Sequence, residues 1–139
     1  MKLPDNFLPQ HPFDHGNLTG RDEKLLPWPR TREEVLEELA VYYAVVDHID
    51  SQVGRMLDQL RADGRLANTV VIFTSDHGLA LGSHGLMGKQ NMYDHSIRVP
   101  FVIAGPGVVP GRRVPAFGYL RDLYPTVCEM AGIAVPNTV

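Results

Sequence analysis

Apolar positions between residues 31 and 63 recur at the spacing of an α-helix. The stripe that they form consists of Val35, Leu39, Tyr42, Val46, Ile49, Val53, Met56 and Leu60. Thr31 is suited to cap the start of this helix, Glu34 completes a capping box, and Gly64 supplies a stop. Further apolar residues widen the stripe, and a wide stripe favours packing against a sheet. We therefore predict one long helix over residues 31–63.

Apolar positions between residues 69 and 103 follow a different pattern. Residues 70–74 (Val-Val-Ile-Phe-Thr) run without alternation, which is typical of a strand buried on both faces. Residues 99–103 form a second run of this kind. Strands next to a long helix indicate an α/β fold, in which helices flank a sheet.

The two ends of the chain carry weaker signals. Residues 1–30 hold five of the eleven prolines and no sustained period, so we expect an extended segment that rests on another surface, one explanation being a surface outside this sequence. Near the other end, Asp122 is a plausible N-cap for a helix over 123–131, and Gly132 stands where a C-terminal glycine belongs. We predict a single partial domain over 1–139, with a strand–loop–strand core and this helix in residues 69–139.

Polar residues follow the first strand at once, in the order Ser75, Asp76, His77, Gly78. Ligands in open α/β sheets bind beyond the carboxyl ends of strands. A carboxylate beside an imidazole suits a divalent cation, provided that Gly78 frees the backbone so that both side chains can turn to one ion. The alternative is that Asp76 forms a turn and His77 is a lone polar residue. We favour a metal site whose other ligands lie elsewhere.

A loop with glycines at four positions then carries His84 and Lys89. The Lys89 ammonium could hold an anionic oxygen of a substrate, although an ordinary surface lysine is the simpler interpretation of this residue alone. His84 could donate a proton to a leaving alkoxide near neutral pH, or could be a rim residue that contacts the substrate. Both interpretations of His84 stay open.

Two other groups of polar residues carry less weight. His11, Asp14 and His15 have the chemistry of metal ligands, but Pro12 denies the two histidines a shared helical face, so a loop or substrate-rim role is favoured. Asp47, His48 and Asp50 lie within the long helix, and we expect structural or solvated roles for them.

Composition excludes several partners. A net charge of −3 gives no reason to expect nucleic acid or an anionic membrane. No apolar run approaches the roughly 18 residues of a membrane span, and the first residues lack a signal-peptide core. The compartment stays open. The single cysteine, Cys128, rules out an internal disulfide framework.

An ordered set of short motifs resembles the distal half of a type I sulfatase, within the alkaline-phosphatase-like superfamily. The set comprises residues 73–78, 82–85, 88–89, 93–94 and 98–100, and the likeness extends to residues 3–16, 29–31, the long helix and 122–126. This resemblance implies an alkaline-phosphatase-like mixed sheet flanked by helices. It also implies that Asp76 and His77 bind a divalent cation, usually Ca²⁺, with Mg²⁺ or Mn²⁺ as alternatives. Lys89 would contact the sulfate, and no role for His84 follows securely.

The sequence departs from the family at the nucleophile. Sulfatases use a formylglycine made from Cys or Ser in a Cys/Ser-x-Pro/Ala-x-Arg motif, whose hydrated aldehyde attacks sulfur. Cys128 is followed by Glu-Met-Ala-Gly and does not fit this motif. We therefore expect the parent protein to hydrolyse a small-molecule or saccharide sulfate ester, and these 139 residues to be inactive alone.

Two other functions and one physical property remain expectations. The parent could be a phosphodiesterase or phosphonate monoester hydrolase of the same superfamily, or the chain could be a truncated, non-catalytic module. Missing sheet neighbours would expose strand edges, so we also expect self-association.

Overall fold

The structure, a computed structural model, describes residues 1–136 and divides the chain into two compact units. The first unit spans residues 1–108 and the second begins at residue 109. The predicted single domain extended to residue 139, and residues 137–139 lie outside the described residues. Each unit is described by itself below.

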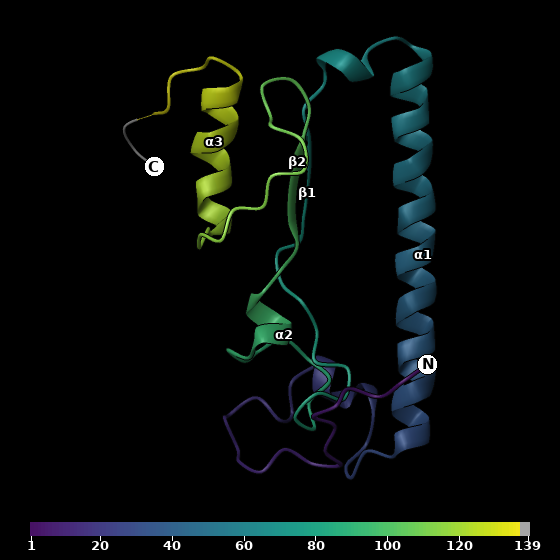
Figure 1. Ribbon diagram of the computed structural model, residues 1–139. Helices are drawn as coiled ribbons and strands as arrows, with labels where there is room; N and C mark the ends of the chain where they lie inside the picture. Colours follow the sequence, from purple (N-terminus) through teal and green to yellow (C-terminus); the bar gives the residue numbers. More distant parts are fainter. Residues whose placement is uncertain (137–139) are drawn as a thin grey trace. The chain divides into compact units, whose positions relative to one another are not determined.

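A long helix dominates the first unit (Figure 1). Helix α1 spans Arg32–Ala62, Thr31 accepts a hydrogen bond from the Glu34 amide, and the Glu34 carboxylate in turn accepts from the Thr31 amide. The predicted capping box is thus confirmed. Gly64 follows the helix with φ +67°, a left-handed conformation that glycine adopts without strain.

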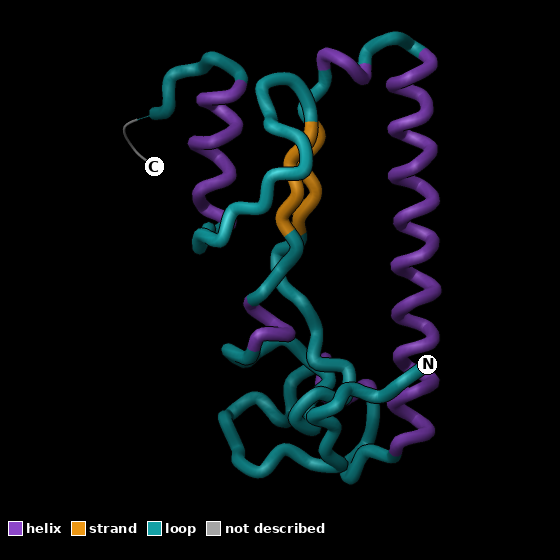
Figure 2. Tube along the Cα trace, viewed as in Figure 1, coloured by secondary structure: helices purple, strands orange, loops and turns teal. Residues whose placement is uncertain are grey.

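The sheet in the described residues is a two-stranded antiparallel hairpin (orange in Figure 2). Strand β1 spans Val71–Thr74 and strand β2 spans Phe101–Ala104, with Thr74 opposite Phe101. β2 begins later than predicted, after Pro100, which has no amide hydrogen for a ladder. The carboxyl end of β1 therefore lies beside the start of β2, and residues 75–100 connect the two strands at this end of the sheet.

The expectation that β1 is buried on both faces is wrong for this chain. Phe73 is 48% exposed and Phe101 is 51% exposed. The physical reason is that an antiparallel pair can face solvent on one side, and the first unit leaves about half of each ring exposed. The long helix differs from expectation in the same way, because only Val35 and Leu39 of its apolar stripe are buried.

The core of the first unit lies at the amino-terminal end of α1. It joins three segments through six buried side chains: Leu3, Leu26, Val35, Leu39, Leu81 and Met87. Residues 1–30 consist of turns, bends and irregular backbone apart from η1, a 3-10 helix over Asp22–Leu25. Their supporting surface belongs to this chain, since Phe7 bridges Ser83 and the His84 amide donates to the Asn6 carbonyl at 2.9 Å.

Four short elements complete the described chain. The 3-10 helix η2 spans Leu66–Asn68 and the one-turn helix α2 spans Asp94–Ile97. In the second unit, the 3-10 helix η3, Leu120–Asp122, leads into α3, Leu123–Met130. Asp122 precedes α3 as predicted but does not cap it, because its carboxylate accepts from the Tyr119 amide instead. Gly132 follows with φ +68°, as predicted.

Candidate functional site

The loop after β1 folds back on itself through backbone hydrogen bonds. The Ala80 amide donates to Gly88 at 3.0 Å, and the Gly82 amide donates to Leu86 at 2.7 Å. Gly82 and Gly85 have φ of +95° and +73°, and a Cβ at either would press against its neighbours. These two glycines are therefore required where they stand. The loop is largely buried, so it is a rigid support for residues at its ends.

Asp76 and His77 form a pair at the carboxyl end of β1. One oxygen of Asp76 lies 3.2 Å from Nε2 of His77, and the other accepts from the His77 amide at 2.9 Å. The two side chains thus turn toward each other although the residues are adjacent. Desolvation acts to raise the pKa of Asp76, but the hydrogen bond from the His77 amide and the electrostatic contribution of His77 outweigh it, so the pKa of Asp76 is lowered.

The donor chemistry of this pair fits a divalent cation, and its number of donors does not complete a site. A carboxylate oxygen and an imidazole nitrogen lie side by side, and the Asp76 side chain is 77% exposed. Within the described part of the chain, no group of three or more His, Cys, Asp or Glu residues could hold a metal ion. Asp76 and His77 can therefore supply part of a coordination shell.

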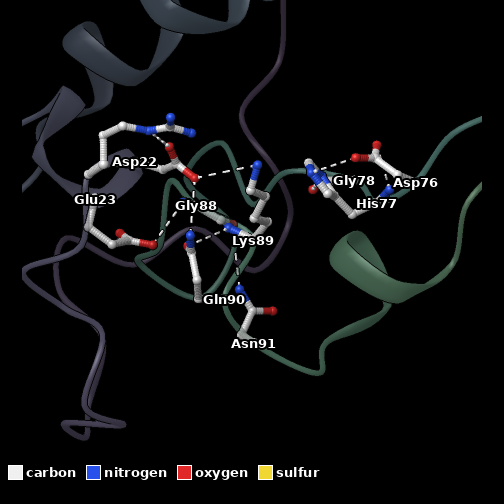
Figure 3. A network of polar contacts seen from close by, with 10 residues as sticks. Asp22, Glu23, Asp76, His77, Gly78, Gly88, Lys89, Gln90 and Asn91 are labelled. Atoms are coloured by element: carbon white, nitrogen blue, oxygen red, sulfur yellow. Dashed lines mark hydrogen bonds and ion pairs between the residues drawn. The ribbon is translucent and has the colours of Figure 1, made fainter.

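Lys89 follows the folded loop and is paired with an acid. Its Nζ lies 3.9 Å from Oδ2 of Asp22 in η1, and 28% of its side chain is exposed (Figure 3). The pKa of Asp22 is lowered, chiefly by a hydrogen bond from Arg21, with smaller contributions from Gln90 and the charge of Lys89. The long distance to Asp22 and the partial exposure leave the Lys89 ammonium able to contact an anion.

His84 occupies an unusual backbone position. Its φ is +55°, a left-handed value that is uncommon for a residue other than glycine. The His84 ring stacks on Tyr93 with centroids 4.0 Å apart, and its Nε2 lies 3.0 Å from the Asn6 amide nitrogen. With Asn6 donating in this way, Nε2 is unprotonated, so a proton on the neutral ring sits on Nδ1. This places His84 in a packed cluster beside the loop.

Figure 3 shows two polar sets among the predicted residues. Asp76 contacts His77, whereas Lys89 contacts Asp22 and neighbours in its own loop. Among residues 1–136, no hydrogen bond or ion pair joins Lys89 to the Asp76–His77 pair. That one substrate contacts both sets remains a prediction.

The other groups of polar residues take the following places. His11 is buried and its Nδ1 lies 2.7 Å from the His84 carbonyl, which is a loop-packing contact. Asp14 and His15 are exposed in the same loop. Asp47, His48 and Asp50 are exposed on α1.

Sequence reasoning missed the charged residues that support Lys89. Glu23 and Arg30 form a buried ion pair at 2.7 Å, and Glu23 accepts hydrogen bonds from the loop. Both lie in the proline-rich segment, where no periodic pattern of apolar residues predicts which side chains are buried. The available signal was an acid and a base within a proline-rich segment. Such a signal does not identify the residues that they contact.

The chain matches known sulfatases over nearly all of its length. The family model described as Sulfatase matches residues 4–133. The chain belongs to the sulfatase family. It is 42% identical over 132 residues to arylsulfatase K from Danio rerio, covering 95% of this chain and 24% of that protein.

Bacterial sulfatases are also similar to this chain. A choline-sulfatase from Rhizobium meliloti (strain 1021) is 39% identical over 105 residues, covering 76% of this chain and 20% of the relative. A Bacteroides fragilis protein assigned to the sulfatases, solved by crystallography, superimposes with a TM-score of 0.71 at 31% identity, covering 92% of this chain and 28% of that one. The predicted alkaline-phosphatase-like α/β class is thereby confirmed.

This sulfatase chain spans between a fifth and a quarter of the length of those curated relatives. Members of the family generally use a divalent metal ion and a formylglycine, and act on sulfate esters. Cys128, the free cysteine of the chain, is buried in α3 and its context does not fit a formylglycine site. No helix in the described residues is long and apolar enough to cross a membrane.

Proposed function

We propose that the polypeptide containing this chain hydrolyses a sulfate ester, and that Asp76, His77, Lys89 and His84 belong to its active site. The observation that supports this best is the Asp76–His77 pair at the end of β1, with its exposed carboxylate, within a chain of the sulfatase family. The pair lies where ligands of α/β sheets bind. Hydrolysis of a small-molecule or saccharide sulfate is thus the function that the chain supports.

Each side chain has a definite task in this proposal. Asp76 and His77 hold part of the shell of one divalent cation, with Ca²⁺ favoured and Mg²⁺ or Mn²⁺ as alternatives. When bound, such a cation stabilises negative charge on the transferring group. Lys89 binds a sulfate oxygen, since an ammonium placed toward developing charge lowers the barrier by electrostatic attraction.

His84 contributes through its ring position. Its Nε2 accepts from Asn6 in this arrangement, so donation to a leaving alkoxide requires that the Asn6 contact be exchanged for a proton. A rim role in which the ring contacts the substrate requires no such exchange. The proposal includes both tasks, and the pH dependence of turnover separates them. The residues of this chain do not supply a formylglycine.

The role of Lys89 is tested by turnover of an aryl sulfate by the complete polypeptide. Removing a charged donor from the transferring group costs roughly 10²- to 10³-fold in kcat. We expect Lys89→Ala to lose activity on this scale, and Lys24→Ala, an exposed lysine on η1, to keep it. Greater activity on a phosphate diester or phosphonate monoester would assign the protein to another activity of the superfamily.

The cation is tested by calorimetry on the same polypeptide. Asp76→Asn should weaken binding of Ca²⁺, Mg²⁺ or Mn²⁺ by tenfold or more, since a neutral amide attracts a divalent ion far less than a carboxylate does. Asp94→Asn is the matched control, because Asp94 is exposed and pairs with Arg98 at 3.8 Å. No divalent binding to the unmodified polypeptide would favour a non-catalytic module.

A further inference from the structure

Two opposite charges are buried beside the loop that carries Lys89. The side chains of Arg30 and Glu23 are 0% and 2% exposed, and they contact each other at 2.7 Å. Burial lowers the pKa of Arg30, and the hydrogen bond and charge of Glu23 counteract this effect. Burying both charges carries a desolvation cost that a hydrophobic pair would not incur. This cost indicates that the pair has a role other than simple packing.

Their contacts converge on one short stretch of backbone. The Arg30 guanidinium donates to the carbonyl of Gly85 and, at 2.9 Å, to the carbonyl of Glu23. The Glu23 carboxylate accepts from the amides of Met87 at 3.0 Å and Gly88 at 2.8 Å. The pair thus holds residues 85–88 through one carbonyl and two consecutive amides.

The held stretch ends directly before Lys89. Figure 3 shows Glu23 reaching Gly88 while the neighbouring Asp22 faces the Lys89 ammonium. Gly88 allows this approach, because a Cβ there would lie 2.8 Å from Oε1 of Glu23 and 3.1 Å from Cβ of Asp22. The backbone immediately before Lys89 is therefore anchored by charge, hydrogen bonds and shape together.

We propose that Glu23 and Arg30 are positioning residues, which fix the backbone at 87–88 so that Lys89 presents its ammonium to the sulfate group. This inference rests on the proposed function of Lys89. Neither residue touches the substrate in this proposal. The charge of Glu23 is needed because a carboxylate accepts hydrogen bonds from both amides at once. The charge of Arg30 is needed because a planar guanidinium donates hydrogen bonds to two carbonyls and to the carboxylate.

The experiment measures two properties of the complete polypeptide for each variant. The first is amide hydrogen exchange at residues 87–88, and the second is the dissociation constant for inorganic sulfate. In Glu23→Gln one carboxylate oxygen becomes an amide NH₂ and can no longer accept. We expect at least tenfold faster exchange at these amides and a dissociation constant raised at least fivefold. Arg30→Lys should act in the same direction, and Glu37→Gln, an exposed acid on α1, should change neither.

Gly88→Ala provides a second route if Glu23 variants do not fold. It keeps both charged side chains in the sequence and forces the backbone at residue 88 and the Glu23 carboxylate apart, so it should reproduce both effects. Faster exchange with unchanged sulfate affinity would show a merely structural pair and overturn the inference, as would unchanged exchange. Lys89→Ala separates the two proposals: it should weaken sulfate binding while leaving exchange at residues 87–88 slow. Unchanged sulfate affinity in Lys89→Ala would instead overturn the role proposed for Lys89 itself.

Discussion

Three aromatic and imidazole rings cluster beside the glycine loop, residues 78–88, and two of them stack. His84 lies on Tyr93, and His95 lies 5.6 Å from Tyr93 and 6.0 Å from His84, centroid to centroid. Nε2 of His95 is buried without a hydrogen-bond partner in the described residues. A neutral imidazole tolerates this environment better than a charged one does.

The pKa of His95 is accordingly lowered from its ordinary 6.5, first by burial and then by His84, while Glu23 and Asp94 oppose the shift. The unfolded chain thus binds a proton at His95 at a higher pH than the folded chain does. The stabilisation that His95 provides is complete above pH 6.5 and is lost as the pH falls below this value toward the folded pKa.

We therefore expect the free energy of unfolding of the complete polypeptide to fall between pH 7 and pH 5.5, and to fall less in His95→Gln. Urea unfolding at the two pH values measures this difference. His48→Gln, at an exposed position on α1, should retain the full pH dependence. Equal dependence in His95→Gln and the unmodified protein would contradict the assignment.

At the scale of elements, the position of the Asp76–His77 pair depends on contact between the loop after β1 and α2. The Gly78 amide donates to the Ser96 carbonyl at 2.9 Å. A Cβ on Gly78 would lie 1.9 Å from the carbonyl oxygen of His95, an atom that belongs to backbone and cannot rotate away. Only glycine allows α2 to lie this close behind His77.

Gly78→Ala should consequently displace either His77 or α2. Overpacking of this kind typically costs about 1–3 kcal/mol, and we expect a comparable loss of unfolding free energy together with weaker cation binding. Chemical denaturation and calorimetry measure the two effects. Gly118→Ala is the matched control, because nothing lies within 4 Å of its added Cβ. Unaltered cation affinity in a destabilised Gly78→Ala protein would separate packing from site geometry and count against this prediction.

At the scale of the whole molecule, apolar surface is left uncovered on both main elements of the first unit. Ile49 and Met56 on α1 are 48% and 67% exposed, and Val102 on β2 is 56% exposed. The hairpin also has two outer edges without a ladder partner in the described residues. Such edges and stripes are templates for association with other chains.

We therefore expect the 139-residue chain, expressed by itself, to self-associate in sedimentation experiments. Ile49→Glu places a charge in the exposed stripe and should reduce association, whereas Ser51→Glu adds the same charge at an exposed polar position and should change it less. A monodisperse monomer that unfolds cooperatively would contradict the prediction.

Local patterns carried much of the fold. The helix over 31–63 was predicted within one residue at each end, because the capping box at Thr31 and the glycine at 64 act through neighbours three residues away or fewer. The break after β1 was predicted for a similar reason, since apolar residues stop abruptly at Ser75. The burial of α1 and β1 could not be read from period alone, because it depends on which surfaces are present to cover each stripe.

The sequence by itself determined the family, the main elements and the residue types at the candidate site, because these follow from motifs and short-range periodicity. Only the tertiary structure placed residues 1–30 on the glycine loop and brought Glu23 and Arg30 to the backbone before Lys89. Those contacts join positions more than fifty residues apart, such as Glu23 with Met87 and Arg30 with Gly85. Their partners depend on the folded path of the chain, and no local pattern of apolar and polar residues encodes that path.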